Sequence, residues 1–280
     1  MSSNSAASFY KYIPLFLSLL FLSMPLFAST PPNEKKLLIL IIASDNHPAF
    51  IELQEIWRRY MHSDPEHIEA YFIKGDPNLS VENEIVGDTI YSRIKDCYRP
   101  GILEKTVLSM EFMLDKIKEC DYVLRTNLSS FYVFPKLLRF LNTLPKTNCY
   151  CGRPLVPCHG DVTSEFYNVP FAWGLGFILS PDMAELLVEN KEELLAKKWD
   201  APDDVAIGGF FHNKGVKITL ADFVAFTTYN DWVRKKEVLP KNAFHFRAKK
   251  HYLKRQKQDN YDDELLILTE LLEKFYPEAN

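Results

Sequence analysis

Apolar residues occur along this chain in blocks that predict strands and helices in alternation. The apolar runs within 35–44 and 122–126 are nearly continuous, which is typical of strands buried on both faces, as in a parallel sheet. At 49–61 and 103–118 the apolar residues recur at helical spacing, which predicts two amphipathic helices. Alternating strands and helices favour an α/β fold in which helices flank one sheet, in a single domain. The same reasoning predicts further strands at 68–73, 85–90, 171–179 and 217–221 and further helices at 134–144, 182–190, 205–213 and 262–275.

The ends of two predicted strands are where a ligand is expected. Ligands of open α/β sheets bind outside the carboxyl ends of the strands. These ends carry Ser44 and Asp45 after the first strand, and Arg125 and Asn127 at the end of the fourth. We therefore expect these positions to contribute polar groups to a binding site.

The N-terminal segment, residues 1–32, differs from the rest of the chain. Residues 13–28 carry no charge and follow Lys11, which is typical of a secretory segment. One interpretation is a signal peptide cleaved near Ala28. The other is an uncleaved signal anchor, lengthened to membrane-spanning size by the aromatic residues before it. Both predict that the domain at 33–280 enters the secretory pathway or cell envelope, either secreted or attached to the membrane by one span.

Composition and charge narrow the class of protein. Apolar residues make up 47% and charged residues 25% of the chain, which is close to the average of globular proteins and excludes a disordered or collagen-like chain. With 33 Lys and Arg against 37 Asp and Glu, the net charge is −4, which argues against a nucleic-acid partner.

The five cysteines do not predict a metal site. Cys149 and Cys151 are followed by Cys158, a spacing that does not match the usual zinc fingers. Two interpretations remain, a loop disulfide such as Cys151–Cys158 and plain buried thiols.

The last residues, 241–280, combine a basic segment with an amphipathic helix. Residues 245–257 are rich in Lys and Arg and contain no acidic residue, and the predicted helix at 262–275 is acidic. The basic segment is suited to bind a diphosphate, to remain a solvated surface, or to contact anionic lipid headgroups.

Two adjacent carboxylates, Asp203 and Asp204, stand where a loop meets a predicted helix. Backbone N–H groups at a helix N-terminus hold a carboxylate ionised and orient it. Such a group above a pocket can act as general base on a hydroxyl. The alternative is a structural pair that only caps the helix.

A second motif, Trp173-Gly174-x-Gly176, lies on a predicted strand. Its glycines allow a ligand to approach the backbone closely, and the Trp173 ring offers a face to a sugar or a base. The alternative is a strand that needs glycines for packing against its neighbours.

The order of these motifs resembles a known family. In chain order they are Glu84-x-x-x-Asp88-x-Ile90, Asp96-x-Tyr98, Lys105-Thr106, the strand at 122–126, Trp173-Gly174-x-Gly176-Phe177-x-x-Ser180 and Asp203-Asp204-Val205-x-Ile207-Gly208. Together they resemble the fringe-like β-1,3-glycosyltransferases. The resemblance implies a GT-A fold, a Rossmann-like nucleotide-sugar-binding fold with a mostly parallel central sheet. It also implies a nucleotide-sugar donor, usually UDP-linked, a glycan acceptor, and inversion of the anomeric centre. It makes Asp204 the first and Asp203 the second candidate for the base.

The chain departs from that family where the family binds its metal. An acidic Asp-x-Asp motif that binds Mn²⁺ is replaced by Asn127-Leu128-Ser129. Because hard divalent cations prefer charged oxygen ligands, this segment would hold Mn²⁺ poorly, and we expect no metal ligands and no required cofactor. Three explanations are open. Fixed cations, with Lys105, Arg125 and the His245-x-Arg247-x-Lys249 segment as candidates, can replace the metal at a leaving diphosphate. Alternatively the protein binds a different donor, or it binds sugars without turning them over. The predicted nucleotide-sugar-binding residues are Ser44, Asp45, Lys105, Arg125, Asn127, Ser129, His245 and Arg247, and the predicted acceptor- or sugar-binding residues are Trp173, Gly174 and Gly176.

Two other functions are consistent with the sequence. The altered metal motif would also suit a protein of the same fold that binds sugars or nucleotides without catalysis. The basic segment would suit a membrane-surface protein. The carboxylate pair in its motif context favours the transferase, because binding alone does not require it.

Overall fold

The computed structural model describes residues 35–156, 165–196, 201–249 and 261–279, which belong to one compact unit, Glu34–Asn280. The predicted signal segment at 1–32, Cys158 and residues 250–257 of the basic segment lie outside the described residues. Of the helices in the described part, none is long and apolar enough to cross a membrane.

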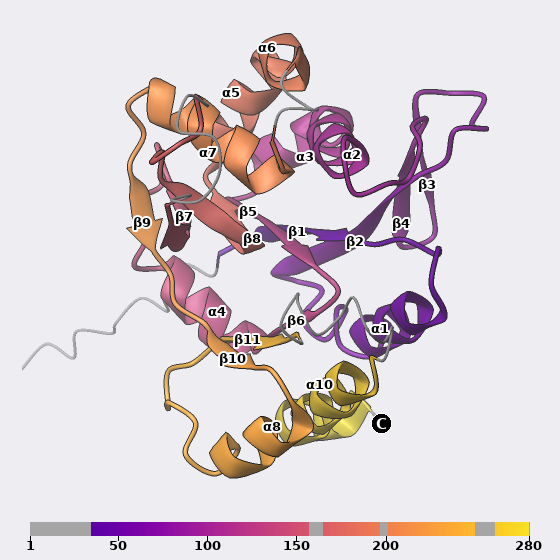
Figure 1. Cartoon of the computed structure of the whole chain (residues 1–280), viewed down its shortest axis with the longest axis vertical. Helices are drawn as coiled ribbons and strands as arrows, with labels where there is room; N and C mark the ends of the chain where they lie inside the picture. The colour runs from indigo at the N-terminus through magenta and orange to yellow at the C-terminus, as the bar shows by residue number, and fades with distance from the viewer. Residues whose placement is uncertain (1–34, 157–164, 197–200, 250–260, 280) are drawn as a thin grey trace, which may run out of the picture. The chain divides into compact units, whose positions relative to one another are not determined.

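Within the described residues, an eight-stranded sheet has the order β3-β4-β2-β1-β5-β8-β7-β9 (Figure 1). The four neighbours β4, β2, β1 and β5 are parallel, and β8 pairs antiparallel with β5 and β7. The predicted α/β class, with a mostly parallel central sheet flanked by helices, is confirmed. The strands are β1 (Leu37–Ile42), β2 (Ile68–Gly75), β3 (Asn83–Val86), β4 (Thr89–Ser92), β5 (Tyr122–Asn127), β7 (Tyr150–Leu155), β8 (Phe171–Leu179) and β9 (Ile218–Leu220).

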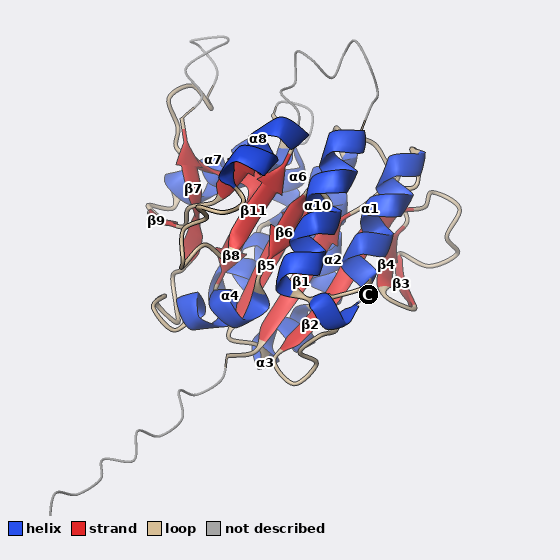
Figure 2. Cartoon of the chain, turned by 90° about the horizontal axis from the view of Figure 1, so that it is seen from below, coloured by secondary structure: helices blue, strands red, loops and turns tan. Residues whose placement is uncertain are grey.

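Helices cover both faces of this sheet, which explains the apolar run of β1. Successive side chains of a strand point to opposite faces. Leu38 and Leu40 pack under α2, α3, α5, α6 and α7, whereas Leu37, Ile39 and Ile41 pack under α1, α4, α8 and α10 (Figure 1). On the second face α1 and α10 lie side by side (Figure 2). The helices are α1 (Pro48–Arg58), α2 (Gly101–Phe112), α3 (Leu114–Glu119), α4 (Phe134–Leu141), α5 (Pro181–Glu189), α6 (Lys191–Ala196), α7 (Asp203–Asn213), α8 (Tyr229–Lys235), α10 (Asp262–Phe275) and the 3-10 turn Pro277–Ala279.

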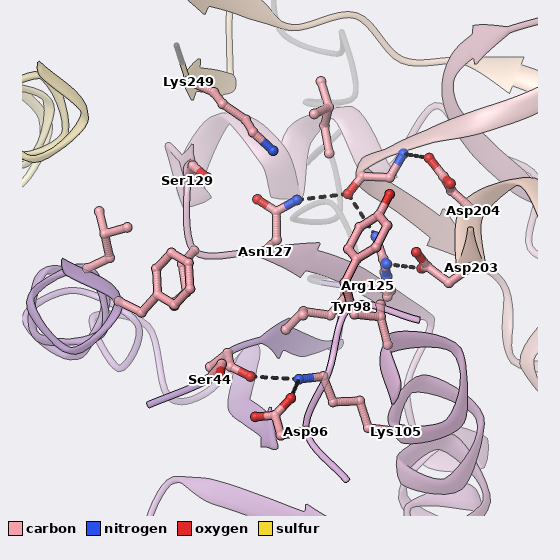
Figure 3. A pocket seen from close by; sticks show the side chains of 18 of the residues that line it. Ser44, Asp96, Tyr98, Lys105, Arg125, Asn127, Ser129, Asp203, Asp204 and Lys249 are labelled. Carbon is pink, nitrogen blue, oxygen red and sulfur yellow. Dashed lines mark hydrogen bonds and ion pairs between the residues drawn. The ribbon is translucent and has the colours of Figure 1, made fainter. Parts of the chain in front are cut away.

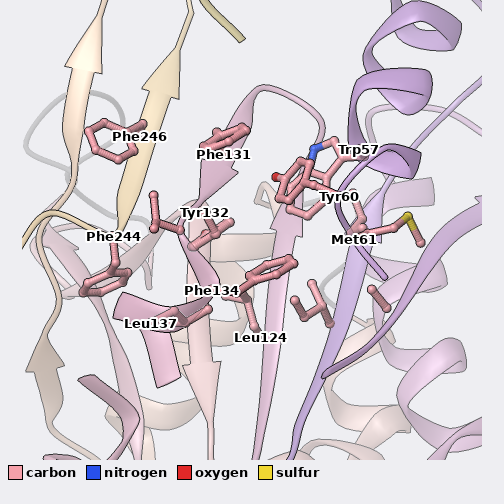
Figure 4. Packing of buried hydrophobic residues seen from close by; sticks show 14 of the residues in the cluster. Trp57, Tyr60, Met61, Leu124, Phe131, Tyr132, Phe134, Leu137, Phe244 and Phe246 are labelled. Atoms are coloured by element: carbon pink, nitrogen blue, oxygen red, sulfur yellow. The ribbon is translucent and has the colours of Figure 1, made fainter. Parts of the chain in front are cut away.

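A small sheet of order β10-β11-β6 completes the second face and brings the basic segment to the end of β5. Its strands are β6 (Ser130–Tyr132), β10 (Val224–Phe226) and β11 (His245–Ala248). Aromatic side chains of β6 and β11 pack near those of α1 and α4 (Figure 4). Because β11 pairs antiparallel with β6, Arg247 lies opposite Ser130, close to the carboxyl end of β5.

Some element boundaries differ from the prediction. The single strand expected at 85–90 is a hairpin of β3 and β4, because Gly87 turns the chain with a φ of 60°. The long helix expected at 103–118 is interrupted at Met113, between α2 and α3. Helix α7 begins at Asp203, two residues earlier than expected, so both aspartates lie in its first turn.

Cys149, just before β7, and Cys151, within it, are thiols. Cys149 and Cys151 are buried and free, and burial raises the pKa of the Cys149 thiol to about 11. This agrees with the second interpretation of the cysteines and contradicts the disulfide between Cys151 and Cys158. In the described part of the chain, no three His, Cys, Asp or Glu side chains converge as a metal site.

Candidate functional site

A cavity of about 360 Å³ opens at the carboxyl ends of β1 and β5 (Figure 3). Its walls come from elements far apart in sequence: the chain after β1, the start of α2, the chain after β5, β8, the first turn of α7, and β11. The sheet places these segments together because ligand-binding loops follow the carboxyl ends of parallel strands. The predicted site residues that line the cavity are Ser44, Lys105, Arg125, Asn127, Ser129, Trp173, Gly174, Asp203, Asp204 and Arg247.

The main chain of Gly174 is the centre of a hydrogen-bond network in this cavity. Its N–H donates to Asp204 Oδ2 over 2.8 Å. Its carbonyl oxygen accepts from Arg125 Nη1 and from Asn127 Nδ2, each over 2.8 Å. A Cβ at this position would lie 2.8 Å from Asp204 Oδ2, closer than real side chains approach, so only glycine leaves the carboxylate in place.

Asp204 is a half-buried carboxylate that faces the cavity from the first turn of α7. Its Oδ2 accepts from Gly174, and its Oδ1 accepts from the Val205 N–H over 3.0 Å. An ionised carboxyl group offers about four acceptor positions, so these two bonds orient the group and leave capacity for a ligand hydroxyl. The arrangement is suited to a general base.

Asp203 has a different environment. It is buried, and its carboxylate forms an ion pair with the guanidinium of Arg125, which is 2% exposed. Burial lowers the pKa of Arg125 to about 10, while the nearby Asp204 carboxylate opposes this shift, so Arg125 remains charged at neutral pH. The pair ties α7 to β5 and neutralises much of the charge that Arg125 could offer to a phosphate.

Lys105 is a second cation that the structure pairs internally. Its ammonium group donates to the Ala43 carbonyl and to Asp96 Oδ1, each over 2.7 Å. Burial lowers the pKa of Lys105, and the Asp96 carboxylate opposes this shift. The contacts link the end of β1 to α2 and to the loop before it, and all three residues line the cavity.

Asn127 bridges Gly174 and the basic strand β11. Its Nδ2 donates to the Gly174 carbonyl, and its Oδ1 accepts from Arg247, which also donates to Ser130 Oγ over 3.4 Å. A carboxylate at this position would bring an acceptor against the Gly174 carbonyl. The side-chain oxygen already faces a guanidinium, which repels a divalent cation. The residues at this strand end therefore do not fit Mn²⁺.

Three predicted site residues lie outside the cavity lining. Asp45 is exposed, and its Oδ1 accepts from Lys74 over 2.7 Å. His245 stacks on Tyr132 with ring centroids 4.4 Å apart, and burial lowers its pKa to about 3, so it is neutral and cannot offset phosphate charge. A Cβ on Gly176 would collide with the Tyr132 hydroxyl, so this glycine serves packing. The structure therefore does not place these three residues in the lining of this cavity, and their predicted contact with a ligand stays a prediction.

Aromatic side chains stand at the mouth of the cavity. Trp173 is 39% exposed and makes an edge contact with Phe223, and Tyr98 is 68% exposed. Exposed aromatic faces can stack on sugar rings or bases. Tyr98 lines the cavity but was not among the predicted site residues, and Lys249, which also lines it, was considered only as part of the basic segment. In the sequence, Tyr98 belongs to the Asp96-x-Tyr98 motif and Lys249 belongs to the basic segment, and these patterns could have indicated both residues as site residues.

Comparisons with known proteins identify no family. No family model matches the chain, and no curated protein matches it. Among solved structures, the chain is similar to the crystal structure of a glycosyltransferase involved in the glycosylation of the major capsid of PBCV-1. The identity is 9% and the TM-score 0.46, over 76% of this chain and 93% of that chain. A likeness this distant does not identify an activity, and the resemblance to the fringe-like family rests on the motifs alone.

Proposed function

We propose that this protein is an inverting glycosyltransferase that moves a sugar from a nucleotide-sugar, UDP-linked, to a hydroxyl group of a glycan. One observation carries the proposal. Asp204 is held by the Gly174 N–H inside a cavity at the carboxyl ends of β1 and β5, where α/β sheets bind their ligands. The motif order that resembles the fringe-like family supports the same reaction.

In the proposed reaction, Asp204 accepts the proton of the acceptor hydroxyl while the oxygen of that hydroxyl attacks the anomeric carbon of the donor. The bond between that carbon and the diphosphate oxygen breaks, and the nucleoside diphosphate leaves with the bonding electron pair. Asp203 and Arg125 hold the first turn of α7 and so position the base. Trp173 offers its ring to the acceptor. Since the residues around Asn127 do not fit Mn²⁺, cations of the protein stabilise the leaving group.

The alternatives differ in what they require of the structure. A sugar-binding protein without catalysis would use the same cavity. This alternative is favoured by Asn127, which stands where the fringe-like family has a metal-binding carboxylate. A membrane-surface protein would require the basic segment to be exposed. In its described part, 245–249, the strand His245–Ala248 is buried along its whole length and Lys249 is half-buried. The structure therefore does not favour lipid contact by this strand.

The test measures nucleoside-diphosphate release from a panel of UDP-sugars with glycan acceptors. Asp204→Asn is expected to lower kcat by about 10²- to 10⁴-fold, the usual contribution of a general base, with an unchanged Tm. Asp203→Asn tests the positioning role separately, through its effect on stability. It leaves Arg125 buried without its partner and is expected to cost about 3–5 kcal/mol of stability.

EDTA is expected to leave the rate of transfer unchanged. Transfer that EDTA abolishes and Mn²⁺ restores would contradict the metal-free reaction. Full activity of Asp204→Asn would remove the base assignment. Saturable UDP binding without turnover of any donor would favour the sugar-binding alternative.

A further inference from the structure

Trp173 is exposed at the cavity, and a second aromatic side chain restrains its ring. It lines the cavity and is 39% exposed, which is unusual for so large an apolar side chain. Its ring and that of Phe223 make an edge contact, with centroids 5.6 Å apart and ring planes at 66°. Aromatic pairs prefer this geometry, so Phe223 favours one orientation of the exposed ring.

Phe223 lies in the chain between β9 and β10, which is attached to the main sheet. The Ala221 N–H donates to the Gly152 carbonyl of β7 over 3.1 Å. Asp222 forms an ion pair with Arg153 of β7 over 2.8 Å, and its Oδ1 also accepts from the Phe223 N–H over 2.9 Å. The backbone that carries Phe223 is therefore held at a fixed place beside the cavity.

Behind Phe223 the aromatic contacts continue into the core. Its ring lies 5.5 Å from that of His245, and His245 stacks on Tyr132 with centroids 4.4 Å apart. Both His245 and Tyr132 are buried, and the Tyr132 hydroxyl lies 3.1 Å from the Thr126 hydroxyl of β5. The ring of Trp173 is thus the exposed end of a series of aromatic rings that begins in the core.

Trp173 is also next to the residue that holds the proposed base. The peptide bond between Trp173 and Gly174 carries the N–H that donates to Asp204 Oδ2 over 2.8 Å. All three residues line the same cavity. Because a strand rises by only about 3.3 Å per residue, a sugar ring seated on Trp173 can bring one of its hydroxyl groups to the carboxylate.

We propose that Phe223 is a positioning residue for the acceptor, because it holds the ring of Trp173 as a platform for one face of a pyranose. This assignment rests on the proposed function and deepens it, since it makes the acceptor a pyranoside that binds by its ring face. A pyranose with mainly equatorial hydroxyls presents axial C–H groups, and the negatively polarised face of an aromatic ring attracts them. A platform that is ordered before binding lowers the entropy lost when the sugar binds.

The binding test uses the full chain, with the methyl β-glycosides of glucose, galactose and N-acetylglucosamine as probes titrated by saturation-transfer NMR. Trp173→Ala removes the contact surface and is expected to weaken binding by about tenfold or more. Phe223→Ala is expected to weaken it by about two- to tenfold, the usual cost of ordering one large side chain on binding. Phe223→Tyr keeps the ring and should bind the glycosides as the wild type does.

Phe140→Ala is the matched control. Phe140 is half-buried, as Phe223 is, and its ring stacks on that of Phe244 with centroids 4.6 Å apart, but it lies on α4 and does not line the cavity. This variant should bind the glycosides as the wild type does. Phe223→Leu keeps apolar volume without an aromatic ring, and it replaces Phe223→Ala if circular dichroism shows that variant to be unfolded.

Transfer kinetics distinguish positioning from a structural role. Phe223→Ala should raise the KM for the acceptor and leave kcat and the KM for the donor unchanged, because it weakens only the binding of the acceptor. A purely structural role would lower Tm and the active fraction while the KM for the acceptor stayed the same.

The outcomes separate this platform from the proposed function. Wild-type affinity for the glycosides in the folded Phe223 variants, or no glycoside binding by the wild type, would overturn the platform. If glycoside binding depends on Trp173 and Phe223 while the wild type transfers no sugar from any UDP-sugar, the platform stands and the proposed function fails. If the wild type transfers sugar and the folded Phe223 variants keep its KM for the acceptor, the function stands and the platform fails.

Discussion

Replacing Gly174 with alanine is expected to slow sugar transfer without unfolding the protein, because the new methyl group would displace the Asp204 carboxylate. A Cβ at Gly174 would lie 2.8 Å from Asp204 Oδ2, 3.1 Å from its Cγ and 3.3 Å from Arg125 Nη1. Gly174 is not among the glycines with positive φ, so alanine is compatible with its backbone. The effect therefore comes from lost space.

The size of the effect follows from these distances. To reach ordinary contact at 3.4 Å, the carboxylate must retreat by about 0.6 Å, which weakens its 2.8 Å bond from the Gly174 N–H. Since a misplacement of about 1 Å can cost about 10²-fold in rate, we expect kcat to fall by about 10- to 100-fold. Overpacking in a closed core lowers the free energy of unfolding by about 1–3 kcal/mol. For Gly174→Ala we expect a loss at the lower end of this range, because the carboxylate can move into the cavity.

The assay compares kcat and KM for the donor in a double-mutant cycle. If Gly174→Ala acts through Asp204, the double variant with Asp204→Asn should be no slower than Asp204→Asn alone. A control measurement of Tm should show that both single variants remain folded. Wild-type kcat in Gly174→Ala, or losses that multiply in the double variant, would refute the reasoning.

Two further predictions concern stability. Because burial holds the pKa of His245 at about 3, well below its ordinary value of 6.5, the unfolded chain takes up a proton that the folded chain does not. As the pH is lowered from 6.5 to 3, this group should therefore decrease the free energy of unfolding by up to about 1.4 kcal/mol per pH unit. Urea titrations at several pH values should show that His245→Phe lacks this pH-dependent contribution. Burial raises the pKa of Glu270, but hydrogen bonds from Tyr229, Trp232 and Lys236 outweigh it and lower the pKa to about 2. Glu270→Gln should thus lower the free energy of unfolding by about 1 kcal/mol at pH 7, and this difference from the wild type should disappear as the pH falls from 4.5 toward 2. A difference that stays constant over this range would contradict the role of the charge.

Sequence patterns predicted the long, regular elements best. The apolar run of β1 was interpreted as a strand covered on both faces, and the helix at 262–275 matches α10. The short strands β6, β10 and β11 left no periodic signal, since three or four residues do not span enough of a pattern. They matter for the site because β11 carries Arg247 to Asn127.

The candidate site was predicted in its residue types more reliably than in its contacts. Polar residues at the ends of β1 and β5 lie in one cavity because the topology of parallel strands requires it. His245 and Gly176 were selected by residue type, but both pack against Tyr132. Whether a polar group serves a ligand or the fold depends on its neighbours in space, and these are distant in sequence.

The sequence by itself determined the class of fold, the carboxylate pair at the start of a helix, and the replacement of an acidic metal motif by Asn127. Only the tertiary structure decided which cations face the cavity. Arg125 is matched by Asp203 and Lys105 by Asp96, whereas Arg247 reaches the cavity through a strand pairing across more than a hundred residues. The physical reason is that an ion pair depends on distance in space, which only the packing of helices and strands establishes.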